Sequence, residues 1–159
     1  MKPAVILFSA VLLAGGVAHA QTAPAAPAAA SAVDPAQFLA TNAKAPGVVV
    51  LPSGLQYKIV KAGPAGPSPK EGDVIKVDYE GALLSGQVFD ATTGKKPALM
   101  PLADLIPAWM EAIPKMHVGD EWMIYAPPAL GYGDRGVGPI PPGSVLVFRI
   151  KLLGMLSAD

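Results

Sequence analysis

Short runs of strand-forming residues, separated by glycine and proline, dominate the sequence from residue 48 onward. In the first run, Leu55, Tyr57 and Ile59 alternate with polar neighbours, which is the two-residue period of a strand with one face on a core. The strand-like runs are 55–59, 75–80, 88–89, 121–125 and 145–153. Because turn residues fill the connections, the sequence predicts an antiparallel sheet of about five strands.

One segment interrupts this pattern with helical spacing. Trp109 and Ile113 are four residues apart and share a helix face, Pro107 falls in the first turn, and Pro114 limits the helix to about two turns. Asp104 or a neighbour is expected to cap it. A sheet with one short helix on it is an α+β arrangement, in which Trp109 could form the floor of an apolar pocket.

The first 20 residues have the composition of an export signal. Lys2 precedes an apolar run from Ala4 to Ala18, which ends in the small-residue triplet Ala18-His19-Ala20. The run is too short to span a membrane comfortably, although an uncleaved anchor is the alternative. We therefore expect a signal peptide at 1–20, cleavage after Ala20, no membrane span afterwards, and a periplasmic or secreted location.

Two further segments precede the strands. Residues 21–33 contain two prolines and no charged or aromatic residue, and they are expected to form a disordered tether. Residues 34–46 are expected to form a short helix, with Asp34 as its cap, Pro35 at its first position and Pro46-Gly47 at its end. Such a helix is too short for an independent coiled interface, so we expect a monomer. Residues 47–157 form the predicted main domain.

Composition excludes several kinds of site. Twelve basic and twelve acidic residues give a net charge of 0, so nucleic acid is not an expected partner. The chain has no cysteine, which excludes thiolate metal sites, iron–sulfur clusters and cysteine nucleophiles. His117 is the only histidine outside the first 20 residues, so a multi-histidine metal site is excluded as well. We expect no metal and no cofactor.

Two local motifs are not expected to carry chemistry. Gly131–Gly136 fits the dinucleotide pattern G-x-G-x-x-G, but prolines on both sides prevent the strand–turn–helix context that the pattern needs. His117 is interpreted as an exposed turn residue, and no serine lies in a nucleophile-elbow pattern. The remaining candidates are large apolar and aromatic side chains at the ends of elements. They form either a pocket or simply the core, and composition alone favours the core.

Six blocks of sequence carry a family resemblance, and they are 51–61, 77–81, 86–90, 105–109, 127–136 and 140–148. In order and spacing they resemble the FKBP-type peptidyl-prolyl cis-trans isomerases over roughly residues 48–156. The resemblance implies a five- to six-stranded antiparallel half-barrel sheet wrapped around one short helix, an α+β fold. It also implies isomerase activity toward proline-containing polypeptides, in support of the folding of exported proteins.

By position, the resemblance implies a proline pocket between the sheet and the helix. The implied catalytic residues are Tyr79, Phe89, Asp90, Trp109, Tyr132 and Phe148, and the implied substrate-binding residues are Met100, Leu105, Ile106 and Ile140. Trp109 would lie under the prolyl ring, and the backbone N–H of Ile106 would bind a substrate carbonyl. Asp90 and Tyr132 would supply polar contacts.

Four positions depart from the family pattern, namely Met100, Ala108, Gly131 and Pro139. These departures motivate an alternative, a chaperone that binds prolyl or apolar segments with little turnover. The two functions differ in one observable, which is acceleration of X–Pro isomerisation. The resemblance further implies that macrolides of the tacrolimus type bind the same pocket.

Overall fold

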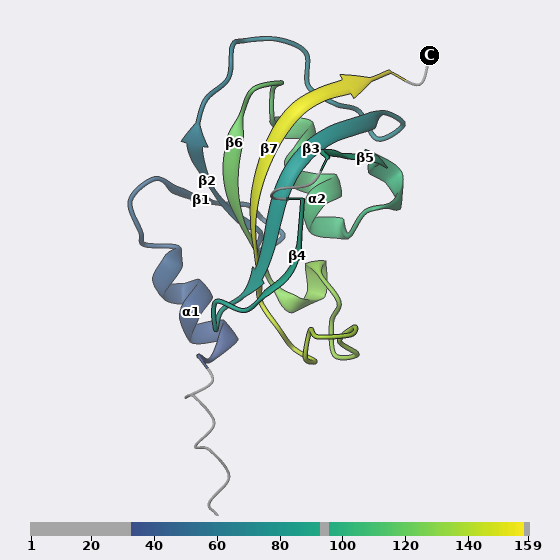
Figure 1. Ribbon diagram of the computed structural model, residues 1–159. Coiled ribbons are helices and arrows are strands. Elements are labelled where there is room, and N and C mark those ends of the chain that lie inside the picture. The colour runs from purple at the N-terminus through teal and green to yellow at the C-terminus, as the bar shows by residue number, and fades with distance from the viewer. Residues whose placement is uncertain (1–32, 93–95, 158–159) are drawn as a thin grey trace, which may run out of the picture. The chain divides into compact units, whose positions relative to one another are not determined.

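A computed structural model describes residues 33–92 and 96–157 (Figure 1). The predicted signal peptide at 1–20 and all of the predicted tether except Val33 lie outside these ranges. Within them, no helix has both the length and the apolar character needed to cross a membrane.

The described residues form one seven-stranded antiparallel sheet. Its strands are β1 (Val48–Val50), β2 (Gln56–Lys61), β3 (Val74–Leu83), β4 (Val88–Ala91), β5 (Ala98–Pro101), β6 (Glu121–Ala126) and β7 (Leu146–Leu156). The hydrogen-bonded order is β1-β2-β6-β7-β3-β4, and β5 pairs with β3. The predicted α+β class and antiparallel sheet are confirmed. The sheet has more strands than expected because β1 and β5 are too short to show alternation.

One face of this sheet carries the core. Alternation along β3 and β7 directs Val77, Ile150 and Leu152 to this face, where all three are completely buried. Figure 1 shows β3, β6 and β7 side by side with α2 (Pro107–Ala112) against them. Trp109 of α2 is 4% exposed, so the helix contributes its large aromatic ring to the core.

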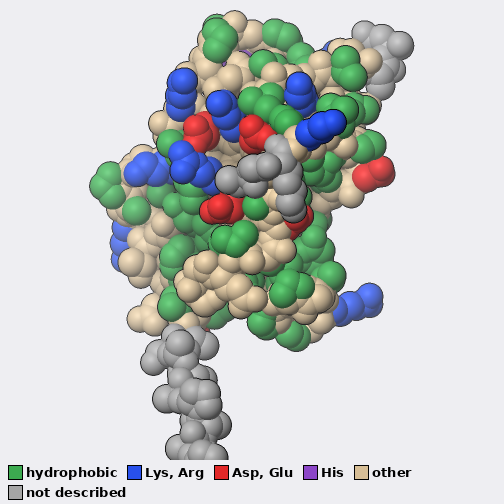
Figure 2. Space-filling view, viewed as in Figure 1, with side chains coloured by type: hydrophobic (Ala, Val, Ile, Leu, Met, Phe, Trp, Pro, Cys, Tyr) green, Lys and Arg blue, Asp and Glu red, His purple; other side chains and the backbone are tan. Residues whose placement is uncertain are grey.

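The opposite face of the sheet is charged. Its charged side chains include Lys76, Asp78, Glu80, Glu121, Arg149 and Lys151. Arg149 pairs with Glu121 across β6 and β7, and Figure 2 shows basic and acidic side chains interspersed in the upper part of the view. Charges of alternating sign on neighbouring strands compensate one another, so this face is a solvated surface.

The helix predicted near residues 34–46 is α1 (Pro35–Asn42). Asp34 caps it, because its Oδ1 accepts the backbone N–H of Gln37 at 2.8 Å. The helix is attached to the sheet by Gln56, whose Nε2 donates to the carbonyl of Leu39 at 2.8 Å. The Gln56 side chain is 3% exposed, so this attachment satisfies a buried amide.

The start of α2 corrects the sequence-based expectation. Asp104 does not cap the helix, since the N-cap residue is Ile106 and no side chain makes a capping hydrogen bond. Pro107 occupies the first turn, where its missing N–H removes one of the donors that a cap would satisfy. Asp104 instead ends the 3-10 turn η1 (Leu102–Asp104), and a second such turn, η2 (Ile113–Lys115), follows α2.

Candidate functional site

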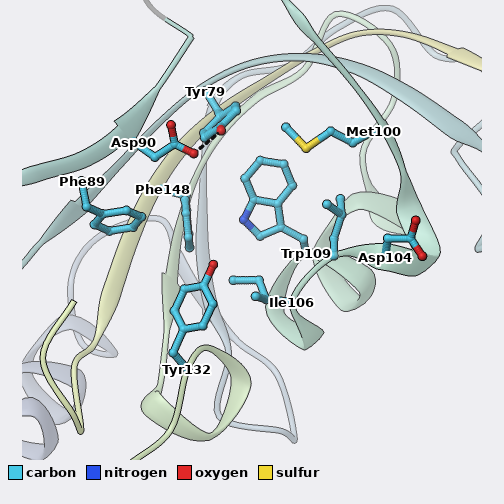
Figure 3. A pocket seen from close by; sticks show the side chains of 10 residues that line it. Tyr79, Phe89, Asp90, Met100, Asp104, Ile106, Trp109, Tyr132 and Phe148 are labelled. Carbon is cyan, nitrogen blue, oxygen red and sulfur yellow. Dashed lines mark hydrogen bonds between the residues drawn. The ribbon is translucent and has the colours of Figure 1, made fainter. Parts of the chain in front are cut away.

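A pocket of about 180 Å³ opens between α2 and the core face of the sheet (Figure 3). It is lined by Tyr79, Phe89, Asp90, Met100, Asp104, Leu105, Ile106, Trp109, Tyr132 and Phe148. Nine of these ten are residues that the sequence predicts for the site, and Asp104 is the addition. The structure does not place Ile140 in the lining. Ile140 is 6% exposed within the core, and its backbone exchanges hydrogen bonds with Val137.

Four aromatic rings form a continuous chain through the pocket. Tyr79 meets Trp109 at 5.1 Å, Trp109 meets Phe148 at 5.4 Å, and Phe148 meets Phe89 at 5.7 Å between ring centroids. Every contact is edge-to-face, with interplanar angles of 86° to 89°. Such contacts contribute about 0.5–1.5 kcal/mol each beyond the burial of their area, so the rings fix one another in place.

A glycine allows two of these rings to approach β3. Gly81 lies opposite Phe148 on β7 and opposite Asp90 on β4. A Cβ at this position would lie 2.7 Å from two ring carbons of Phe89 and 2.9 Å from one of Phe148. Only glycine therefore accommodates both walls. The sequence analysis did not identify Gly81. A glycine inside a strand pattern is the signal that could have done so, since it marks a close approach of neighbouring atoms.

Tyr79 and Asp90 form the polar side of the pocket. The Tyr79 hydroxyl donates a hydrogen bond to Oδ2 of Asp90, as Figure 3 shows. Burial raises the pKa of Tyr79 well above its ordinary value, and the hydrogen bond and negative charge of Asp90 raise it further. The hydroxyl therefore stays protonated. Asp90 lies inside β4 and lines the pocket.

Thr92 was not predicted, and it positions Tyr79 through hydrogen bonds to the Tyr79 backbone. Its Oγ1 accepts the backbone N–H of Tyr79 at 2.8 Å, and its own N–H donates to the Tyr79 carbonyl at 2.9 Å. Thr92 is 7% exposed, so both bonds are protected from water. No local sequence signal identifies this role, because it depends on how β3 lies beside the end of β4.

Two N–H donors in the pocket lining have no partner among the described residues. No backbone hydrogen bond uses the N–H of Ile106, which precedes α2. The Nε1 of Trp109 is buried without an acceptor, and Figure 3 shows it on the side of the ring that faces Phe148. An N–H directed toward an aromatic face is a weak contact, whereas the Ile106 N–H is free to bind a carbonyl oxygen.

The arrangement suits binding and distortion rather than acid–base chemistry. Among residues 33–92 and 96–157, no group of three or more His, Cys, Asp and Glu side chains could hold a metal ion. His117 lies outside the pocket, with a side chain that is 42% exposed, as expected for a turn residue. Residues 131–135 form turns, and residues 136–145 contain no helix. The dinucleotide pattern therefore lacks its structural context.

Comparison with protein families decides the relationship. Residues 66–153 match the family model described as FKBP-type peptidyl-prolyl cis-trans isomerase, which is more than half of the chain. The chain belongs to this family. Residues 9–59 match a second model, that of the domain amino-terminal to FKBP-type peptidyl-prolyl isomerases. This match begins within the predicted signal peptide and ends in β2.

Individual FKBP relatives agree with this assignment. The chain is 46% identical over 123 residues to the outer membrane protein MIP of Legionella longbeachae, covering 76% of this chain and 52% of that protein. The crystal structure of FkpA from Escherichia coli matches with a TM-score of 0.75 and 36% identity, over 79% of this chain and 59% of that one. The FKBP-like fold expected from the sequence is confirmed.

A shorter relative is matched over almost all of its own length. The crystal structure of a peptidyl-prolyl cis-trans isomerase from Pseudomonas syringae pv. tomato matches with a TM-score of 0.73 and 31% identity, over 77% of this chain and 91% of that one. The chain spans about half the length of the curated relatives that it matches first.

Proposed function

We propose that this chain is a peptidyl-prolyl cis-trans isomerase that acts on exported polypeptides as they fold. The observation that carries the proposal is the chain of four edge-to-face aromatic rings, which encloses an apolar pocket beside one free backbone donor. Membership of the FKBP family supports the assignment of this pocket to X–Pro bonds.

Rotation about an X–Pro bond requires neither a nucleophile nor a proton transfer. Resonance in the planar amide creates a barrier of about 18–20 kcal/mol, and twisting the bond removes that resonance together with its charge separation. Transfer into an apolar pocket disfavours the polar planar form relative to the twisted one, and each ~1.4 kcal/mol gained in this way is a tenfold rate increase. The residues present can therefore catalyse the reaction without a cofactor.

Six of the ten lining residues have a defined part in this proposal. The prolyl ring lies on Trp109, with Phe89 and Phe148 as neighbouring walls, and the N–H of Ile106 binds the carbonyl oxygen of a substrate residue. The hydrogen bond from Tyr79 to Asp90 holds the polar side of the pocket in one orientation. Pre-organised groups favour the twisted state because they need no rearrangement when it forms.

The test is the refolding of a protein whose slow phase is limited by a cis proline. Catalytic amounts of the full chain should accelerate that phase, and Phe89→Ala should reduce the acceleration at least tenfold. Val88→Ala is the matched control, since Val88 is the neighbouring β4 residue, is 49% exposed and lies outside the pocket. A chain that binds the unfolded protein without changing the slow phase is the binding chaperone instead.

The same pocket is proposed to take macrolides of the tacrolimus type. Their saturated nitrogen-containing ring has the size and shape of a prolyl ring, and it would occupy the position over Trp109. Isothermal titration with the full chain tests this, and competition by a proline-containing peptide locates the binding. Binding that no prolyl peptide displaces would place the macrolide elsewhere.

Export and a monomeric state complete the proposal. The residues before Gln21 are proposed to direct export to the periplasm and to be cleaved after Ala20, which mass spectrometry of the exported protein would show. The contacts of α1 support a monomer, because its Phe38 ring packs on Tyr125 at 5.9 Å and Leu39 is bonded to Gln56. These groups are thus engaged within the chain. Light scattering that shows a stable dimer at tens of micromolar would refute this part.

A further inference from the structure

A second hollow lies on the core face of the sheet, away from the proposed isomerase pocket. It is a groove of about 370 Å³ beside β2, and none of the residues that line the first pocket lines it. Tyr57 and Ile59 of β2 and Trp122 of the neighbouring strand β6 form its floor. Its walls are formed by Ala62, Gly63 and Ala65 and by Lys115 and His117.

The floor of the groove is apolar and only partly covered. Tyr57 stacks on Trp122 with a centroid distance of 4.3 Å and an interplanar angle of 10°, and Trp122 is 3% exposed. Beside this stack, Ile59 is 49% exposed and also lines the groove. A large apolar side chain that remains half exposed next to an aromatic stack forms a surface that a ligand could cover.

The wall of the groove is held in place by the chain itself. The N–H of Gly63 donates to Oδ1 of Asp120 at 2.5 Å, which ties the loop after β2 to the turn before β6. A Cβ at Gly63 would lie 2.6 Å from the carbonyl oxygen of Val118, so these two segments are in direct backbone contact. The groove is therefore a built feature of the fold and needs no rearrangement to accept a ligand.

The groove presents positive charge. Asp120 is the only acidic residue in its lining, and it is 4% exposed, with Oδ2 accepting the N–H of His117 at 2.8 Å and Oδ1 engaged by Gly63. Lys115 is exposed and makes no ion pair with any described residue. The accessible charge beside the apolar floor is therefore cationic, and a carboxylate is its complement.

The adjacent sheet edge is free over the same residues. β1 pairs with β2 only from Val48 opposite Lys58 to Val50 opposite Gln56. Within the described part of the chain, no strand lies beside the outer edge of β2 at Ile59–Lys61. An unpaired edge offers backbone donors and acceptors to an extended peptide, which is how β-augmentation begins.

We propose that this groove binds an extended polypeptide segment in which a carboxylate stands next to a large apolar side chain. The apolar side chain lies against Ile59 and the Tyr57–Trp122 stack, the carboxylate lies at Lys115, and the backbone of the segment follows the edge of β2. The site is separate from the X–Pro pocket and does not depend on isomerase activity. It would bind an unfolded client at a position that contains no proline.

Two proline-free peptides test this with the full chain, acetyl-Ala-Asp-Phe-Glu-Ala-amide and its charge-swapped counterpart with lysine in place of both acidic residues. Their titration is followed in amide-resolved NMR spectra. The acidic peptide should shift the signals of Ile59 and Lys115 and leave those of Phe89 and Trp109 in place. The basic peptide should bind at least threefold more weakly. No shift at millimolar acidic peptide, or shifts confined to the Trp109 pocket, would overturn the proposal.

Substitutions then separate charge from packing. Lys115→Glu should lower the affinity for the acidic peptide about tenfold and raise the affinity for the basic one. Ile59→Ser should lower the affinity for both peptides. Lys76→Glu is the matched control on the opposite sheet face and should change neither affinity. The dispersion of the NMR signals checks that each variant is folded. All three substitutions alter exposed side chains. Equal affinity of the acidic peptide for a folded Lys115→Glu protein would refute the charge assignment.

Isomerisation of a short Leu-Pro peptide is measured on the same samples. It should be unchanged in Lys115→Glu and in Ile59→Ser, because neither residue lines the first pocket. A chain that binds the acidic peptide but does not isomerise the short one would leave this groove established and refute the proposed function. The reverse result would refute the groove alone.

Discussion

Gly81→Ala is the substitution that most sharply tests the geometry of the aromatic pocket. An added Cβ would lie 2.7 Å from two ring carbons of Phe89 and 2.9 Å from one of Phe148, whereas ordinary contacts begin near 3.4 Å. Phe89 must therefore move by about 0.7 Å and Phe148 by about 0.5 Å, or β3 must shift. Both rings belong to the edge-to-face chain, so the displacement reaches Trp109 as well.

The expected cost has two parts. Overpacking of this kind destabilises a fold by about 1–3 kcal/mol, and the lower backbone freedom of alanine in the unfolded chain offsets about 0.4–1 kcal/mol of it. Displacement of substrate-positioning groups by up to about 1 Å reduces rates by as much as ~100-fold. We expect kcat/KM for a Leu-Pro peptide to fall about tenfold in Gly81→Ala.

A second strand glycine provides the control. A Cβ at Gly154 of β7 would meet only the Cβ of Lys76, at 3.9 Å, so Gly154→Ala introduces no close contact. The assays are isomer-coupled peptide turnover and denaturant unfolding on the same preparation. Gly154→Ala should keep wild-type turnover. If Gly81→Ala also keeps wild-type turnover and unfolding free energy, the close approach of the two rings is not what shapes the site.

Three further outcomes are expected. Asp90→Ala should lower kcat/KM several-fold while the folded fraction stays near one in denaturant unfolding, and full turnover in a destabilised variant would make Asp90 a purely structural residue. The free energy of unfolding should fall as pH rises above about 10, because an unfolded tyrosine ionises there while folded Tyr79, with its raised pKa, does not. Comparison of wild type with Tyr79→Phe between pH 8 and 11 should show a shallower fall in the variant, with a residual slope from Tyr125, whose pKa burial also raises. Met100→Phe should tighten tacrolimus binding two- to tenfold in calorimetry, since an aromatic contact adds about 0.5–1.5 kcal/mol, and unchanged affinity would show that Met100 does not limit it.

The long alternating strands could be predicted from sequence because their periodicity reflects their burial directly. The run at 145–153 became β7 (Leu146–Leu156), in which every second residue up to Leu152 is buried. β5 (Ala98–Pro101) could not be recognised in this way, since it has four residues and ends in proline. Its strand geometry comes from pairing with Val74–Val77 of β3 at a sheet edge, where proline is tolerated.

The functional site, like the sheet, contains residues that local sequence patterns could not identify. Its lining residues come from β3, β4, β5, η1 and the two residues after it, α2, β7 and the segment between β6 and β7, and no local pattern brings such distant positions together. The family resemblance therefore supplied most of them. Gly81, Thr92 and Asp104 were missed because their roles depend on spatial neighbours. Asp104 was assigned to a helix cap by its sequence position, but Pro107 made that cap unnecessary.

Exchange NMR on a short Leu-Pro peptide, with about one hundredth of an equivalent of the full chain, measures catalysis directly. It distinguishes a pocket around Trp109 that lowers the barrier to X–Pro rotation from one that merely binds proline. The cis–trans exchange rate should rise in proportion to the protein added, and it should return to the uncatalysed rate when tacrolimus occupies the pocket. A peptide that shifts the pocket signals of the protein while its own exchange rate stays unchanged would show that the pocket binds proline without catalysing isomerisation.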